Sequence, residues 1–323
     1  KYFLLGAFSS AFFLFGSALL YGYSGSMDLG VISKAIATQS GMDGLLVPGV
    51  LLVLVGLLFK IGAVPFHSWT PDVYQGAPTP VTGFMAACTK VAAFGAILRF
   101  VYVGVADSRW DWAPGLWAVA ILTMVGGAVL SITQTDVKRL LAYSSIAHAG
   151  FVMTGLLAFD RVGISSVMFY VVAYGFATIA AFAIVSLVRD GGSEATHLSQ
   201  WAGLGRNHPV VAGTFAFLLL AFAGIPLTSG FTAKVAVFSA AIGHGATPLA
   251  IVGVLCSAIA AFVYVRIIVL MYFSEPAGDS VRAVSPSMVT TLAISMGVLV
   301  TLVLGVLPSP LLDLAARSSL FLR

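Results

Sequence analysis

A lysine, a glycine and a proline interrupt an apolar run in the stretch Leu58-Phe59-Lys60-Ile61-Gly62-Ala63-Val64-Pro65-Phe66-His67. Proline lacks the backbone donor that a helix needs and clashes with the preceding turn, while glycine relaxes the local dihedral angles. The stretch lies in the deep part of an apolar segment over 46–64. It therefore predicts a helix that breaks at membrane depth.

The same arrangement recurs further along the chain. A second apolar segment, over 209–243, is too long for one straight span and carries Gly224-Ile225-Pro226-Leu227-Thr228-Ser229-Gly230 at its centre. A lysine accompanies each break, Lys60 before the first proline and Lys234 after the second. Paired broken helices are typical of transporters built from internal repeats, whose ion sites lie at the breaks.

The composition of the whole chain places it in a membrane. Of its 323 residues, 59% are hydrophobic and only 9% are charged, and the mean hydropathy is +1.04, outside the range of soluble domains. An apolar segment of about 20 residues can cross a hydrocarbon core of about 30 Å, and only a helix satisfies its own backbone hydrogen bonds there. We therefore predict an all-α, polytopic transmembrane helix bundle forming a single membrane domain over 1–323. The predicted spans cover 2–23, 46–64, 79–103, 114–134, 139–159, 163–188, 209–243, 248–273 and 287–307.

Several classes of function find no support in the sequence. The net charge of +4 is small and spread over loops, so no nucleic-acid partner is expected. Cys88 and Cys256 both fall within apolar spans, and no disulfide framework, metal spacing, phosphate loop or flavin, haem or iron–sulfur motif is present. We expect no cofactor and no metal in this chain.

Two polar segments and the chain start complete the outline. Segment 24–45 is interpreted as a loop or a short interfacial helix. Segment 189–208 is interpreted as a solvated connection in preference to an inter-subunit contact. The chain starts at Lys1 directly before a span and lacks an initiator methionine, so we expect that an upstream part exists.

Three lysines lie within the predicted spans: Lys60, Lys90 and Lys234. A lysine at the bilayer centre costs about 2.5–3.5 kcal/mol on insertion scales, so each is expected to face the bundle interior or water. Snorkelling of Lys90 to the surface would have to cover about 15 Å along the helix. Burial penalises the charged form, so such a lysine can gain and lose a proton. The three lysines are therefore candidate proton carriers.

No carboxylate lies inside the spans. All ten aspartates and both glutamates occupy loops or span ends. A carboxylate partner for Lys60 must then come from upstream or from another subunit. The lack of hard anionic oxygens also argues against a sodium or calcium site.

His148 lies in the middle of its span, with Ser144 one turn earlier on the same face. A histidine in such a polar stripe can relay protons near neutral pH, and it can equally form an interhelical hydrogen bond. His67, just after the first break, can lead protons away from Lys60 or cap a helix. Other polar residues can hold water, although helix packing is the preferred role for them: Tyr143, Tyr170, Tyr174, Ser144, Ser145 and Thr89. Thr135 or Asp136 is expected to cap the helix that Lys138 and Arg139 open.

Four stretches resemble a known family. The run Phe59-Lys60-Ile61-Gly62-Ala63-Val64-Pro65-Phe66-His67-Ser68-Trp69-Thr70-Pro71-Asp72-Val73-Tyr74-Gln75-Gly76-Ala77-Pro78-Thr79-Pro80-Val81-Thr82 closely resembles the subunit N family of proton-pumping NADH:quinone oxidoreductase, respiratory complex I. The pair Thr89-Lys90, the run from Gln134 to His148 and the segment from Gly224 to Lys234 agree with it.

The resemblance implies an antiporter-like fold of fourteen helices with two inverted five-helix repeats, each containing one broken helix. This chain would correspond to the sixth to fourteenth helices. The resemblance assigns proton translocation to Lys60, Lys90, His148 and Lys234, with His67, Tyr143 and Ser144 as further relay candidates. It also implies a glutamate partner for Lys60 on the fifth helix, upstream of Lys1.

The same resemblance implies where the redox chemistry takes place. NADH, FMN, iron–sulfur clusters and quinone would bind to partner subunits, with subunits M and K as membrane neighbours and the peripheral redox arm contacted indirectly. The location would be the bacterial plasma (inner) membrane or, alternatively, an organellar inner membrane. Three alternatives stay open: a subunit of a multisubunit sodium/proton antiporter or membrane-bound hydrogenase, a structural scaffold, and a substrate transporter with a larger polar cavity.

Overall fold

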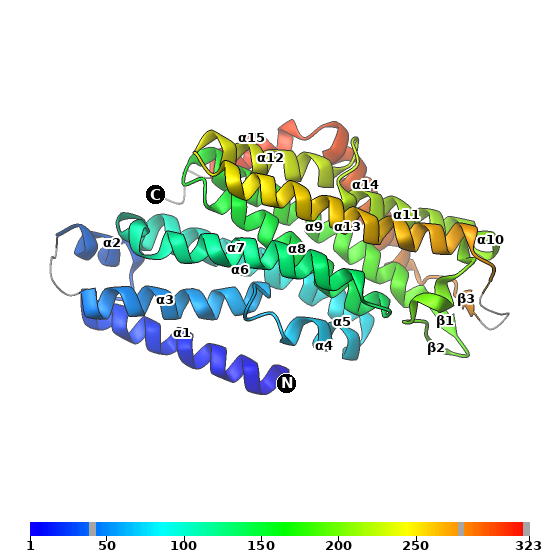
Figure 1. The fold of residues 1–323 in the computed structure, drawn as a ribbon, viewed down its shortest axis with the longest axis horizontal. Coiled ribbons are helices and arrows are strands. Elements are labelled where there is room, and N and C mark those ends of the chain that lie inside the picture. The colour runs from blue at the N-terminus through cyan, green and yellow to red at the C-terminus, as the bar shows by residue number, and fades with distance from the viewer. Residues whose placement is uncertain (39–42, 277–280, 319–323) are drawn as a thin grey trace.

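The computed structural model describes residues 1–38, 43–276 and 281–318, and its long helices lie side by side along one axis (Figure 1). Within these residues, seven helices are long and apolar enough to cross a membrane. They cover Tyr2–Ser24, Gly44–Ile61, Thr79–Gly104, Ala106–Ile132, Arg161–Leu187, Thr247–Phe273 and Met288–Val306. The predicted polytopic helix bundle is confirmed.

The helices follow one another in the order labelled in Figure 1. The first half of the described chain contains α1 (Tyr2–Ser24), α2 (Leu29–Thr38), α3 (Asp43–Ile61), α4 (Trp69–Gly76), α5 (Thr79–Phe84), the π-helix η1 (Met85–Thr89), α6 (Lys90–Arg99), the π-helix η2 (Phe100–Gly104), the 3-10 helix η3 (Ala106–Ser108), α7 (Arg109–Ile132) and α8 (Val137–Leu156). The second half contains α9 (Arg161–Leu187), the 3-10 helix η4 (Leu198–Trp201), α10 (Leu204–Asn207), α11 (Pro209–Ala223), α12 (Ser229–Gly243), α13 (Thr247–Phe273), α14 (Met288–Val306) and α15 (Ser309–Ser318).

The first predicted break lies between α3 and α4. Helix α3 ends at Ile61, and Gly62 has a positive φ of 74°, a backbone conformation that favours glycine. The Val64 N–H, released from helical bonding, donates to Thr123 Oγ1 of α7 at 3.0 Å. Helix α4 after the break was not among the predicted elements, because its eight residues are too few and too polar to read as a span.

Helix α4 is tied to the start of α8 by a charged pair. The Arg139 Nη1 donates to Asp72 Oδ1 at 2.6 Å. Hydrogen bonds from the Lys1 ammonium and from the Arg139 guanidinium lower the pKa of Asp72. Asp72 therefore keeps its negative charge at neutral pH, and the link between α4 and α8 stays charged.

The second predicted break divides the segment 209–243 into two helices of 15 residues each, α11 and α12. Gly224, directly after α11, has a positive φ of 85°. A Cβ added to Gly230 in the first turn of α12 would lie only 1.8 Å from the Ala221 carbonyl oxygen. The polypeptide runs from α3 to α4 toward the end of the molecule that carries the β-strands, and from α11 to α12 in the opposite direction (Figure 1). Opposite directions are what an inverted repeat requires.

Helix α8 is the central helix of the bundle. All of its residues except Arg139 are buried, so its polar side chains contact protein instead of lipid. This position explains why the span predicted over 139–159 is not among the seven apolar helices. Helix α7 approaches it closely, since a Cβ on Gly127 would lie 2.4 Å from the Ala147 nitrogen. The predicted N-cap is confirmed at Asp136, which accepts a hydrogen bond from the Arg139 N–H at 2.9 Å.

Segment 189–208, interpreted as a solvated connection, is largely exposed or half-buried, but part of it is packed against the bundle. Strand β1 (Val188–Asp190) pairs with β2 (Ser193–Glu194) and with β3 (Val281–Ala283) in a small antiparallel sheet. Trp201 is fully buried and its indole N–H donates to the Ala195 carbonyl at 2.8 Å. The Val137 N–H of α8 also donates to the Thr196 carbonyl at 2.7 Å. This region is therefore packed onto the start of α8, because buried apolar side chains outweigh its polar composition.

Candidate functional site

Lys90 lies inside the bundle, as predicted. Its side chain is 4% exposed and its ammonium donates to the Ser145 carbonyl of α8. The ammonium also lies 5.9 Å from the centre of the Tyr174 ring. Lys90 directly follows η1, a π-helical turn with one extra residue, and such turns occur often at functional sites. The position couples a buried cation to the central helix.

His148 connects three helices. It is 3% exposed, and its Nδ1 lies 2.7 Å from the Tyr170 hydroxyl of α9. Its Nε2 lies 3.4 Å from the Tyr264 hydroxyl of α13. The Ser144 hydroxyl contacts the same Tyr264 hydroxyl, so Ser144 and His148 share a polar partner. Both imidazole nitrogens therefore have hydroxyl neighbours that can donate or accept a proton.

Lys234 is held by the second helix break. Its side chain is 6% exposed, and its ammonium donates to the carbonyls of Phe222 and Ala223, each at 2.8 Å. The third donor bonds to the Ser257 hydroxyl of α13 at 2.7 Å. Carbonyls in the last turn of a helix lack intrahelical partners and carry partial negative charge. The break at the end of α11 thus supplies two carbonyl ligands for a buried cation that has no carboxylate beside it among the described residues.

The three buried groups form one row, which we call the axis: Lys90, His148 and Lys234. The Tyr174 ring lies between the first two, with its centre 4.7 Å from that of His148. The Phe222 ring lies 5.7 Å from the His148 ring, and Phe222 also provides a carbonyl to Lys234. A cavity of about 10 Å³ beside His148 is lined by Tyr170, Tyr174, Phe222 and Ser229, among others. That volume holds about one water molecule.

Lys60 lies apart from this row. Lys60 is exposed among the described residues, while its neighbours Phe59 and Ile61 are buried, so its location in the bundle interior or in water stays a prediction. Apolar side chains fill the inner face of α3. No described element covers the face on which Lys60 lies.

The remaining relay candidates divide between two places. Ser144 belongs with His148, as described above. His67 and Tyr143 lie near each other at the first break, with ring centres 6.5 Å apart. Among the described residues, the buried His67 Nδ1 has no hydrogen-bond partner. No hydrogen bond between described residues links this pair to Lys90.

Two residues of the site were not among the sequence candidates: Tyr264 and Ser257, both on α13. They are seven residues apart, so they lie two turns apart on the same face of the helix. That face contacts His148 and Lys234 through hydroxyl groups. A polar pair at this spacing in an otherwise apolar helix is the signal that could have found them.

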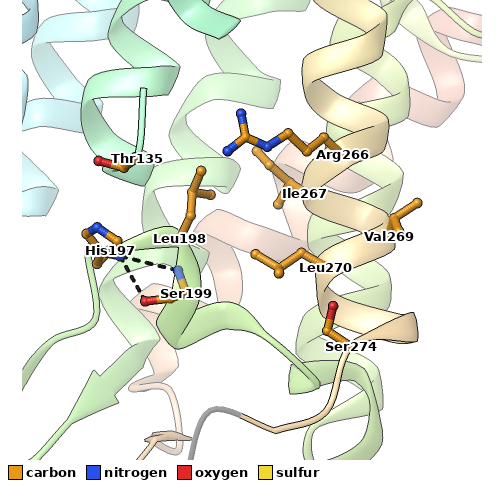
Figure 2. A pocket seen from close by; sticks show the side chains of 9 residues that line it. All are labelled: Thr135, His197, Leu198, Ser199, Arg266, Ile267, Val269, Leu270 and Ser274. Atoms are coloured by element: carbon orange, nitrogen blue, oxygen red, sulfur yellow. Dashed lines mark hydrogen bonds between the residues drawn. The ribbon is translucent and has the colours of Figure 1, made fainter. Parts of the chain in front are cut away.

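A larger cavity, of about 420 Å³, lies away from the axis. Figure 2 shows it between the start of α8, η4 and the last turns of α13, with the side chains of His197 and Arg266 at its sides. The Arg266 Nη1 donates to the Ile132 carbonyl at 2.8 Å and thereby caps the end of α7. None of the three axis residues lines this cavity.

Comparison with known families decides between the possible classes of membrane protein. The family model described as NADH:quinone oxidoreductase/Mrp antiporter, transmembrane, matches residues 1–260. The chain belongs to this family. Within this NADH:quinone oxidoreductase/Mrp antiporter family, the most informative relatives are proteins named NADH-quinone oxidoreductase subunit N. The one from Rhodococcus opacus is 65% identical over 323 residues, and the one from Mycobacterium bovis is 58% identical over 327 residues. These alignments confirm the resemblance to subunit N.

The chain spans about 60% of the length of these curated relatives, although the alignments cover 100% of the chain itself. Among solved structures, respiratory complex I from Thermus thermophilus contains a chain with 37% identity and a TM-score of 0.83, covering 98% of this chain and 68% of that one. The Mrp complex from Dietzia gives a TM-score of 0.86 at 23% identity, covering 99% of this chain and 67% of that one. At that identity the likeness shows the fold alone.

Proposed function

We propose that this chain forms the greater part of a proton-translocating subunit N of NADH:quinone oxidoreductase, and that protons move along Lys90, His148 and Lys234. The observation that carries the proposal is the row of three buried groups that can take up and release protons, each with hydroxyl or carbonyl partners and with room for about one water molecule beside His148. Lys60 is the gated proton acceptor of this scheme, paired with a carboxylate outside the chain.

Electrostatic coupling between the residues of the axis sets the order in which they gain and lose protons. Charges on Lys90, His148 and Lys234 repel one another strongly where the effective dielectric constant is low. A proton therefore settles on His148 only when a neighbouring lysine is neutral. The carbonyls of Phe222 and Ala223 hold the charged form of Lys234, so that a proton arriving there is stabilised until the next charge approaches. The arrival of a proton at one residue of the axis thereby favours release of the proton from its neighbour.

The proposal separates proton transfer from electron transfer. NADH, FMN, the iron–sulfur clusters and quinone belong to partner subunits, and this chain carries out no redox step. Subunits M and K are its proposed neighbours in the membrane, with the peripheral redox arm connected through them. The proposed location is the bacterial plasma membrane, which the actinobacterial sources of the relatives support.

A subunit of a sodium/proton antiporter is the second candidate, because the Mrp complex shares the fold. The 65% identity to a protein named subunit N favours the first candidate. Purification of the intact assembly separates them, since co-purifying flavin and iron–sulfur subunits indicate complex I and their absence indicates an antiporter. A purely structural scaffold would show unchanged proton flux when Lys60, Lys90 and Lys234 are replaced together. A substrate transporter would need more room at the axis than about one water molecule occupies.

The Lys60→Ala variant of the full complex tests the gate. Lys60 is exposed among the described residues, so its removal disrupts no packing between them, and the complex should still assemble. NADH-driven proton uptake by inverted membrane vesicles should nearly disappear. The matched control is Lys34→Ala, which removes an exposed lysine from α2 and should leave proton uptake intact. Full proton uptake in Lys60→Ala would refute the role assigned to Lys60.

A further inference from the structure

One buried lysine outside the axis, Lys138, contacts the turn between α4 and α5. The side chain of Lys138, in the first turn of α8, is only 3% exposed. Its ammonium donates to the Ala77 carbonyl at 2.7 Å and lies 3.5 Å from the Glu194 carboxylate of β2. Burying an ammonium to this extent is costly unless it is paired and hydrogen-bonded. This pair of charges therefore needs an explanation beyond helix capping, which Asp136 already provides.

Glu194 holds the other side of the same turn. Its side chain is 22% exposed, and its Oε2 accepts a hydrogen bond from the Thr79 hydroxyl at 2.5 Å. Ala77 directly follows α4, and Thr79 is the first residue of α5. The ammonium and the carboxylate thus bind the two residues that flank Pro78. Together, Lys138 and Glu194 fix the corner at which the chain turns from α4 into the next span.

That corner sets the path of the helix that carries Lys90. The span Thr79–Gly104 continues without interruption from α5 through η1 into α6. Lys90 lies eleven residues after Thr79, roughly 16 Å along the helix axis. The span Thr79–Gly104 contacts α8 a second time at Lys90, because the Lys90 ammonium donates to the Ser145 carbonyl of α8.

On α8 the two contacts also lie on one face. Lys138 and Ser145 are seven residues apart, which is two helical turns. The span of Lys90 is therefore joined to α8 at two points on the same face, first through the Lys138 and Glu194 pair and then through Lys90 itself. If the contact of Lys138 and Glu194 with the turn shifts, the helix that follows rotates or moves, and Lys90 moves relative to Ser145.

We propose that Lys138 and Glu194 are positioning residues, which keep Lys90 in contact with Ser145 and so maintain proton transfer along the axis. This inference rests on the proposed function of Lys90. It assigns the strands at this end of the molecule a specific task, since β2 carries the carboxylate of the pair. Strand β2 is itself held by its pairing with β1, in which Arg189 lies opposite Glu194.

The test compares protons taken up per NADH oxidised in vesicles that contain the full complex, normalised to the assembled amount. Lys138→Met and Glu194→Gln should each lower this ratio about twofold or more, because each breaks the pairing of a buried ammonium. Glu194→Gln keeps an oxygen that can accept from Thr79, so it isolates the charge. The variant that carries both Lys138→Met and Glu194→Gln should have the same ratio as Lys138→Met, because the first substitution already breaks the pair. Gln200→Ala removes contacts to Asp190 and the His197 backbone within the same segment, and should leave the ratio unchanged.

Two further variants make the outcome decisive. Lys138→Arg keeps the positive charge and should restore most of the ratio; a ratio as low as that of Lys138→Met overturns the proposal. A fall in assembled complex with an unchanged ratio in Lys138→Met and Glu194→Gln also overturns it, since the pair then only anchors the segment. Lys90→Met distinguishes a failure of the proposed function from a failure of the positioning role. Full pumping in Lys90→Met refutes the proposed function, whereas loss there with a normal ratio in Lys138→Met refutes only the positioning role.

Discussion

Lys90→Met will remove most of the NADH-driven proton uptake while the assembled complex persists. Methionine keeps the length and apolar stem of lysine but cannot carry a proton. The substitution leaves only a backbone carbonyl without its extra donor. Proton uptake should fall by about tenfold or more, which corresponds to a barrier raised by about 1.4 kcal/mol. The measurement is proton uptake in inverted vesicles, with quinone reduction followed in the same sample.

The control for this variant is Cys88→Ala, on the same span, where an exposed thiol is removed and proton uptake should not change. Lys234→Met gives an informative contrast. It removes the donor from two carbonyls and a hydroxyl at once, and each unsatisfied buried group costs about 1–3 kcal/mol. We therefore expect loss of both proton uptake and assembled complex. Normal coupling in Lys90→Met would rule out the axis as drawn.

Gly230→Ala should separate the two halves of the second broken helix. The added Cβ would lie 1.8 Å from the Ala221 carbonyl oxygen, which is backbone and cannot rotate away. Overpacking of this kind costs about 1–3 kcal/mol or more. The displaced turn would also carry the carbonyls of Phe222 and Ala223 away from Lys234. Both the thermal stability of the complex and its proton uptake should fall.

Gly243→Ala is the matched control, because it lies on the same helix and a Cβ there would meet nothing within 4 Å. It should behave as the parent complex does in both measurements. An unchanged melting temperature for Gly230→Ala would show that α11 and α12 do not approach each other as closely as described.

Both helix breaks could be predicted because glycine and proline act locally. Their effect on the backbone needs no knowledge of the rest of the fold. The burial of Lys90 and Lys234 could be predicted for a similar reason, since the cost of a charge in hydrocarbon depends mainly on depth. The exposure of Lys60 could not, because it depends on which neighbouring elements cover one face of α3.

The partners of the axis are a product of tertiary contact. Tyr264 and Ser257 follow His148 by more than a hundred residues, and nothing near His148 in the sequence points to them. The packing of part of segment 189–208 could not be predicted, because its polar composition hides Trp201, whose burial depends on tertiary contacts. The task of Lys138 was hidden likewise, because Glu194 reaches it only through the pairing of β1 and β2.

The way in which Lys234 is bound determines which substitutions the site can tolerate during evolution. Two of its three ligands are main-chain oxygens, at Phe222 and Ala223, which every amino acid supplies. Replacement of either side chain leaves that oxygen in place, so the chemistry of the site is insulated from much of the genetic variation at its own positions. What variation can destroy is the shape of the backbone, and that shape depends on Gly224 and Gly230. Two residues without side chains thus protect the binding of a buried charge.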